Sequence, residues 1–142
     1  MEVIVPDASI ILKWVLAGED GVEEEKALEI LHDWLAEKIQ IILPPLWLYE
    51  VGNILGLKRP DQARELLEVL LDYRFEEAQI TEKICGLALE LMQELRVSFY
   101  DAIYHAIALN QKSIFVTADK RYFGKAVKKG QIKLLGSYSR AG

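Results

Sequence analysis

Four acidic residues that lie far apart in the chain have the type and the setting for shared chemistry: Asp7, Glu50, Asp101 and Asp119. Carboxylate oxygens are hard ligands that select Mg²⁺ or Mn²⁺, and no Cys/His spacing indicates zinc. Two carboxylates about 5 Å apart repel by about 3 kcal/mol at an effective dielectric of about 20, so four together need a cation. A divalent cation lowers the pKa of bound water, orients it for in-line attack and stabilises charge on a phosphodiester. The residue types therefore predict metal-dependent hydrolysis that uses no side-chain nucleophile.

The segments that would position these acids alternate between strand and helix. Short apolar runs predict buried parallel strands at Glu2–Pro6, Ile39–Leu43, Ser113–Thr117 and Ile132–Leu135, with Ala78–Ile80 as a further candidate. Apolar stripes at helical spacing predict helices over Glu23–Lys38, Asp61–Tyr73 and Thr81–Leu95, the second of them starting after Pro60. This alternation predicts one α/β domain with a parallel sheet.

The predicted elements give all four acids a route to one edge of that sheet. Asp7 directly follows the first strand, and Asp119 follows the Ser113–Thr117 strand after one residue. Asp101 lies near the start of the helix before that strand, and Glu50 lies in the helix that follows the second strand. Ligand sites of parallel sheets lie at the carboxyl ends of the strands, so we expect the four side chains to meet there.

Each acid also has a purely structural interpretation. Asp101 fits the acidic position of a capping box that begins at Ser98, and Asp7 and Asp119 could make turns with their own backbone. Glu50 is the hardest to explain in this way, because it interrupts an apolar run where an ionised carboxylate is costly unless it is paired or metal-bound. Taken singly, the two interpretations are balanced; taken together, the four acids favour a site.

Length and composition are those of one globular domain. The chain has 142 residues, of which 51% are hydrophobic and 27% charged, enough for a proper core. Its single cysteine, Cys85, excludes an internal disulfide, and the apolar run Ala8–Leu12 is too short for a signal peptide or a membrane span. We therefore expect one domain over residues 1–142, with its core over about residues 1–135, in a cytoplasmic protein without membrane contact.

The net charge of −5 conceals a strongly basic carboxyl-terminal part. From Lys112 onward there are eight Lys or Arg residues against one acid, or +7, which leaves −12 for the residues before it. This distribution suits a phosphate-bearing ligand that approaches one edge, although a solvated lysine-rich surface explains it as well. Lys120, Arg121 and Lys125 follow Asp119 closely and are the candidates for phosphate contacts.

Four segments together resemble the PIN-domain family in order and spacing. They are Val5-Pro6-Asp7-Ala8-Ser9, Tyr49-Glu50-Val51-Gly52-Asn53-Ile54-Leu55, Tyr100-Asp101-Ala102-Ile103-Tyr104-His105-Ala106-Ile107-Ala108 and Val116-Thr117-Ala118-Asp119. Each motif alone is weak, but four in this order form a specific signal that extends from Met1 to about Leu135. The chain is most similar to the small VapC-type toxins of toxin–antitoxin pairs.

The resemblance implies a three-layer α/β/α fold with a parallel, roughly five-stranded sheet and a Mg²⁺ site that Mn²⁺ can also fill. It carries Asp7, Glu50, Asp101 and Asp119 over as catalytic, metal-binding residues. Ser9 and Thr117 match hydroxyl positions that support such acids, Asn53 matches a polar position one turn after the glutamate, and Phe123 an apolar position after the last acid. His105 departs from the usual small or apolar residue and is expected to be packed.

The same resemblance implies cleavage of single-stranded RNA that leaves 5′-phosphate and 3′-hydroxyl ends, a homodimer, and a cognate antitoxin protein whose segment covers the active-site groove. The residues Pro45–Lys58 are apolar over most of a helix circumference, which suits either a partner surface or a helix buried in its own domain.

Two other classes of function compete with the nuclease. One is a different magnesium-dependent phosphate-transfer domain, either a receiver or a haloacid-dehalogenase-like phosphatase. A receiver expects paired acids after the first strand, and the phosphatase expects an aspartate where this chain has Ser9. The other is a non-catalytic PIN-like scaffold that binds RNA or protein, although all four acids are present.

Overall fold

The computed structural model describes residues 1–16 and 21–141 and places a five-stranded parallel sheet at the centre of the molecule. The strands are β1 (Val3–Pro6), β2 (Gln40–Leu43), β3 (Glu76–Glu77), β4 (Ile114–Thr117) and β5 (Ile132–Leu134). Their order across the sheet is β3-β2-β1-β4-β5, and every neighbouring pair is parallel. The predicted fold class, a parallel five-stranded sheet between helices, is confirmed.

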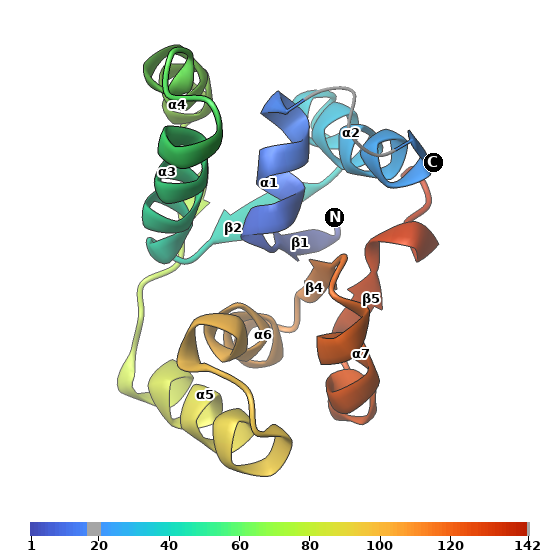
Figure 1. The fold of residues 1–142 in the computed structure, drawn as a ribbon. Coiled ribbons are helices and arrows are strands. Elements are labelled where there is room, and N and C mark those ends of the chain that lie inside the picture. Colours follow the sequence, from blue (N-terminus) through green and yellow to red (C-terminus); the bar gives the residue numbers. More distant parts are fainter. Residues whose placement is uncertain (17–20, 142) are drawn as a thin grey trace.

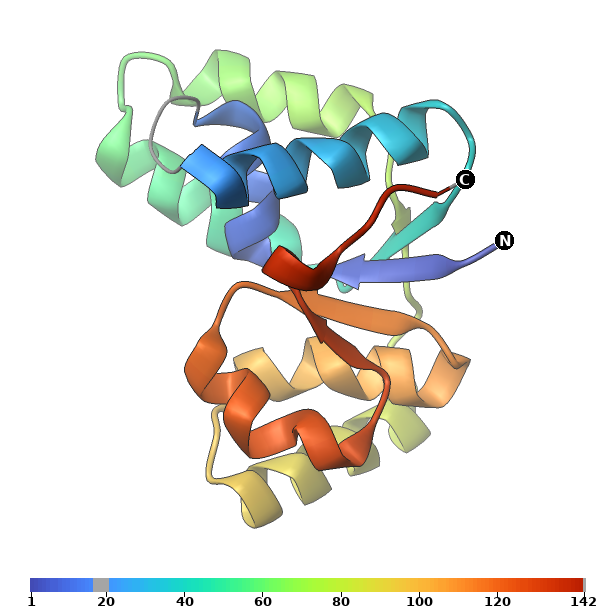
Figure 2. The same ribbon diagram turned by 90° about the vertical axis from the view of Figure 1, so that its right-hand side faces the viewer.

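Helices cover both faces of this sheet (Figures 1 and 2). One face carries α1 (Ala8–Val15), α2 (Gly21–Leu35), α3 (Leu46–Lys58) and α4 (Ala63–Asp72). The opposite face carries α5 (Glu82–Leu95), α6 (Phe99–Gln111) and α7 (Lys120–Ala126). Two 3-10 turns, η1 (Val127–Lys129) and η2 (Leu135–Ser137), flank β5.

The central strands supply side chains to both cores, because successive residues of a strand point to opposite faces. In β1, Ile4 packs against the α1–α4 layer and Val5 against the α5–α7 layer. In β4, Val116 packs against the α1–α4 layer and Phe115 against the α5–α7 layer. All four side chains are buried, which explains why these strands read as continuous apolar runs in the sequence.

Several predicted boundaries are wrong by a few residues. The helix predicted over Glu23–Lys38 ends at Leu35, because the chain turns there and Glu37 adopts a positive φ of 60°. The helix predicted directly after Pro60 begins at Ala63, since residues 60–62 form a turn. The strand predicted at Ala78–Ile80 is β3 and lies at Glu76–Glu77 instead. The sequence did not indicate its position, because an exposed pair of glutamates at the sheet edge gives no apolar signal.

The strand order creates a crevice beside β1. From β1 the chain continues to β2 and β3 on one side of β1, and it then crosses to β4 on the other side of β1. The connections that follow β1 and β4 therefore diverge between these two strands. Such a switch point is the place where parallel sheets bind ligands, beyond the carboxyl ends of the strands. Asp7 leaves β1 and Asp119 follows β4 at this point, and Asp7 N donates to Val116 O at 3.1 Å.

The carboxyl-terminal residues fold back across α2 (Figure 2). Asp33 is fully buried on that helix and accepts hydrogen bonds from the Tyr138 hydroxyl at 2.6 Å, Ala141 N at 2.9 Å and Arg140 Nε at 3.2 Å. Within residues 1–16 and 21–141, no helix has the length and apolar character that crossing a bilayer requires.

Candidate acidic active site

The four predicted acids line one cavity of about 220 Å³ at the carboxyl ends of β1 and β4. Asp7 comes from the end of β1, Glu50 from α3, Asp101 from the first turn of α6, and Asp119 from the turn before α7. The walls between them consist of further side chains: Ala8, Ser9, Tyr104, Phe115, Thr117 and Tyr122. Both helix layers and the central strands therefore contribute to the same cavity.

Asp7 is held in place by four hydrogen bonds from donors of its own turn and of β4. It is the N-cap of α1, and its Oδ1 accepts from Ser9 N at 3.0 Å, from Ile10 N at 3.3 Å and from the Ser9 hydroxyl. Its Oδ2 accepts from the Thr117 hydroxyl, which in turn accepts from Asp119 N at 3.0 Å. Thr117 thus connects the first acid to the last, across 110 residues of sequence.

Asp101 and Asp119 lie at helix starts, where an anion is favoured by free backbone N–H groups and by the helix dipole. Ser98 is the N-cap of α6, and its hydroxyl accepts from Asp101 N at 3.1 Å, which confirms the predicted cap. Asp119 is the N-cap of α7, and its Oδ1 accepts from Tyr122 N at 2.9 Å. Asp119 therefore both caps a helix and lines the cavity.

Glu50 has a tyrosine as its partner and no cation. The hydroxyl of Tyr104, which is buried on α6, donates to Glu50 Oε1 at 2.6 Å. In the described part of the chain, none of the four acids takes part in an ion pair. Among the described residues, therefore, no cation pairs with Glu50.

The carboxylates raise one another's pKa in addition to the effect of burial. Burial raises the pKa of Glu50, and the charges of Asp101 and Asp7 raise it further against the hydrogen bond from Tyr104. Burial also raises the pKa of Asp7, although four hydrogen bonds to its oxygens oppose this. Burial and the charge of Asp119 raise the pKa of Asp101. The cavity thus concentrates negative charge that nothing in its walls neutralises.

The donor set fits a hard divalent cation. Its ligand atoms are carboxylate oxygens, the preferred partners of Mg²⁺ and Mn²⁺, and the repulsion among them is what a bound cation would relieve. In the protein without metal, no group of three His, Cys, Asp or Glu side chains among the described residues is arranged to hold an ion. The four carboxylates therefore share one cavity without converging on one coordination point.

Of the other predicted site residues, Ser9 and Thr117 contact Asp7, whereas Asn53 does not line the cavity. Asn53 lies one turn after Glu50 on α3, and its side chain is exposed. Phe123 is half-buried on α7 and does not line the cavity either.

A second cavity, of about 320 Å³, shares Asp101, Asp119 and Tyr122 with the first. Two of the three predicted basic residues, Arg121 and Lys125, line it, and Lys120 is exposed outside it. Arg96 is a third cation in this wall that the sequence did not reveal. It stands far from the basic end of the chain, at the left-handed C-cap of α5, where Lys125 Nζ donates to its carbonyl oxygen at 3.4 Å.

His105 is buried behind this wall, as expected of a packed residue. The carbonyl oxygen of Gly130 can only accept, so the imidazole Nε2 donates to it at 2.8 Å. Nδ1 consequently accepts from the Tyr122 hydroxyl at 2.8 Å, which orients the ring that lines the acidic cavity. Burial lowers the pKa of His105, in agreement with a neutral imidazole.

Comparisons with known proteins agree with this geometry. The chain is similar to a solved structure titled a toxin–antitoxin complex from Klebsiella pneumoniae, with a TM-score of 0.65 and 18% identity over 93% of this chain and 97% of the other. It is similar to VapBC2 from Rickettsia felis bound to a DNA fragment from the promoter, with a TM-score of 0.65 and 19% identity over 93% of this chain and 96% of the other. It is also similar to FitAB bound to an IR36 DNA fragment, with a TM-score of 0.68 and 12% identity over 98% of this chain and 99% of the other. The comparison with curated proteins gives no match. By sequence, residues 4–129 match the PIN domain, and the chain belongs to the PIN-domain family.

Proposed function

We propose that this protein is a Mg²⁺- or Mn²⁺-dependent endoribonuclease that hydrolyses phosphodiesters of single-stranded RNA. The observation that carries the proposal is the gathering of Asp7, Glu50, Asp101 and Asp119, from four distant segments, around one cavity. No cation in the described part of the chain pairs with any of them. Membership of a family of nucleases supports the same activity. The products would be 5′-phosphate and 3′-hydroxyl ends, as the family implies.

In this proposal the four carboxylates would hold the divalent cation, which would supply an activated water and stabilise negative charge on the phosphodiester. The protein's own residues orient the carboxylates. Thr117 and Ser9 direct both oxygens of Asp7, and Tyr104 leaves one oxygen of Glu50 free by bonding the other. The backbone N–H of Tyr122 at the start of α7 holds Oδ1 of Asp119.

The basic wall beside the acids would bind the RNA backbone. Arg121 and Lys125 line a cavity that opens onto Asp101 and Asp119, so a phosphate held there lies next to the reacting one. Lys120 is exposed outside both cavities, and we assign it a weaker contact.

We also infer that the protein is the toxin of a toxin–antitoxin pair, with a cognate antitoxin as its partner, and that it forms a homodimer. Structures titled as toxin–antitoxin complexes are similar to almost its full length, which supports the first inference. On α3, Trp47, Val51 and Leu55 pack into the protein's own core, but Leu57 and Tyr49 are 74% and 72% exposed and could contact a partner.

The test of the nuclease is removal of one charge at a time. We expect Asp7→Asn, Asp101→Asn and Asp119→Asn each to weaken Mn²⁺ binding, measured by calorimetry, and to abolish cleavage of a labelled single-stranded RNA. For Asp101→Asn and Asp119→Asn the melting temperature without metal should hold or rise, because each change relieves repulsion among carboxylates. Full activity in two of these variants would refute the site. Intact RNA binding by a wild-type protein that never cleaves with Mn²⁺ would favour the scaffold instead.

A further inference from the structure

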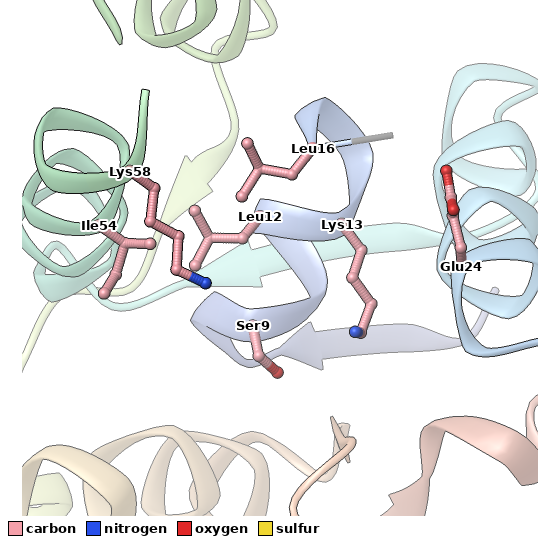
Figure 3. Close-up of a pocket in the computed structure, with 7 residues that line it drawn as sticks. All are labelled: Ser9, Leu12, Lys13, Leu16, Glu24, Ile54 and Lys58. Atoms are coloured by element: carbon pink, nitrogen blue, oxygen red, sulfur yellow. The ribbon is translucent and has the colours of Figure 1, made fainter. Parts of the chain in front are cut away.

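A third cavity adjoins the acids on the side away from Arg121 and Lys125. Its volume is about 150 Å³, and it lies between α1, α2 and α3. Figure 3 shows its lining, with Ser9 at the start of α1 and the side chains of Lys13 and Lys58 on either side of it in this view. None of the functions assigned above uses this cavity.

This lysine cavity, defined by Ser9, Lys13, Glu24 and Lys58 with apolar side chains between them, is continuous with the acidic cavity through one residue. Ser9 lines both, and its hydroxyl donates to Asp7. A group bound by the lysines would therefore lie directly beside the proposed reaction centre.

The face of α3 leads from one cavity to the other. Glu50 lines the acidic cavity, and Ile54 and Lys58 line the lysine cavity, at successive intervals of four residues. Residues four apart share one face of a helix, so the face that presents Glu50 also presents Lys58, about 12 Å further along the axis. Helical side chains lean toward the N-terminus of their helix, and Figure 3 shows Lys58 extending from α3 toward α1 in this manner.

Lys58 carries the charge that is available to a ligand. Lys13 already pairs with Glu23 at 3.9 Å, and Glu24 is the acid that α2 contributes to the lining. Lys58 is exposed, and its side chain has no ion pair or hydrogen bond among residues 1–16 and 21–141. The cavity beside the acidic site thus presents a cation with no partner among the residues that the structure describes.

We propose that the lysine cavity is a second backbone subsite, in which Lys58 binds a phosphate of the RNA strand on the opposite side of the cleaved bond from Arg121 and Lys125. The inference rests on the proposed nuclease function and adds the path of its substrate. The acidic cavity alone repels a polyanion, so cations on both flanks hold the strand across it. The three cavities follow one another in the order basic, acidic and basic, joined by Ser9 on one side and by Asp101 and Asp119 on the other.

The first test measures cleavage of a labelled single-stranded RNA with Mn²⁺. We expect Lys58→Ala to lower kcat/KM about fivefold, the upper end of what an exposed ion pair contributes, and Lys58→Glu to lower it further. The slope of log kcat/KM against log salt should become shallower by about 0.7, the value for one phosphate contact on a single strand. Lys83→Ala is the matched control, because Lys83 is an exposed lysine on α5 that lines none of the three cavities.

The second test establishes that the two basic cavities bind opposite ends of the strand. RNAs with one cleavage position are shortened stepwise from the 5′ end or from the 3′ end. The penalty of Lys58→Ala should vanish when one end is shortened, and that of Arg121→Ala when the other is shortened. A Lys58→Ala variant equal to Lys83→Ala, or penalties that vanish at the same end, would overturn the subsite while leaving the nuclease intact. A wild-type protein that cuts no RNA with Mn²⁺ would instead refute the proposed function, and the subsite with it.

Discussion

Replacing Glu50 by Gln separates a carboxylate of a metal site from a structural residue, because it keeps the shape and the hydrogen bond from Tyr104 and removes only the charge. Two unit charges about 6 Å apart repel by about 3 kcal/mol at an effective dielectric of about 20. Glu50 is only half-buried, so solvent and salt reduce the repulsion from Asp7 and Asp101 to about 1 kcal/mol. Without metal, Glu50→Gln should therefore stabilise the protein by about that amount.

For a chain of this length, 1 kcal/mol corresponds to a shift of about 2–4 °C in melting temperature. We expect thermal unfolding in EDTA at neutral pH to show a rise of this size for Glu50→Gln. The same variant should lose RNA cleavage with saturating Mn²⁺. Glu90→Gln is the control, because Glu90 is an exposed glutamate on α5 outside the cavity, and it should change neither quantity.

The opposite pair of results would refute this reasoning. If Glu50 were instead structural, weakening its charged hydrogen bond with Tyr104 would cost about 1.5–3 kcal/mol, which would lower the melting temperature by about 3 °C or more. A Glu50→Gln variant that melts this much lower and still cleaves RNA at the wild-type rate would make Glu50 a structural residue. The proposed site would then consist of three acids.

Three further predictions concern residues around the site and in the frame that holds it. Thr117→Val removes a buried hydroxyl that bonds Asp7, so we expect a loss of about 1–3 kcal/mol in urea unfolding and weaker Mn²⁺ binding, whereas Thr117→Ser should retain both. Burial lowers the pKa of His105 in the folded state, so the unfolded chain binds the proton more tightly. The free energy of unfolding should therefore be at its full value above about pH 6.5 and should fall as the pH drops below it. Melting curves of His105→Gln should show a shallower fall than the wild type over this range. Burial disfavours the charge of Asp33, but the hydrogen-bond donors Tyr138, Ala141 and Arg140 outweigh this effect and lower the pKa of Asp33. We therefore expect Asp33→Asn to lose about 2–4 kcal/mol of unfolding free energy in urea at pH 7. RNA cleavage at low temperature should persist in this variant.

The acids of the cavity were predictable because their positions follow local rules. Asp7 and Asp119 come directly after buried strands, Asp101 stands in the first turn of a capped helix, and Glu50 interrupts an apolar segment. Each of these features can be read within a few neighbouring residues. The convergence of the four then follows from a parallel sheet, whose strands all end at the same edge.

The side chains that the sequence did not reveal depend on contacts between distant elements. Tyr104 reads as one more apolar position of α6, and its role appears only when α3 brings Glu50 to its hydroxyl. Arg96 joins the basic wall because α5 ends in a left-handed residue beside α7. The position of Lys58 also depends on a contact between distant elements, because only the packing of α3 beside α1 makes it line a cavity with Ser9. No local pattern distinguishes these residues from ordinary surface or core positions.

The position of β1 between β2 and β4 sets the time at which the protein acquires its acidic cavity during synthesis. The amino-terminal strand is made first, but its neighbour β4 and the hydroxyl of Thr117 arrive 110 residues later, and Asp119 only after them. Contacts of such long range form late, because the intervening chain must first be closed into a loop. A growing chain therefore carries Asp7 for more than a hundred residues of synthesis without the strand that orients it. The proposed nuclease activity would therefore begin only after β4 has paired with β1 and Asp119 has been made.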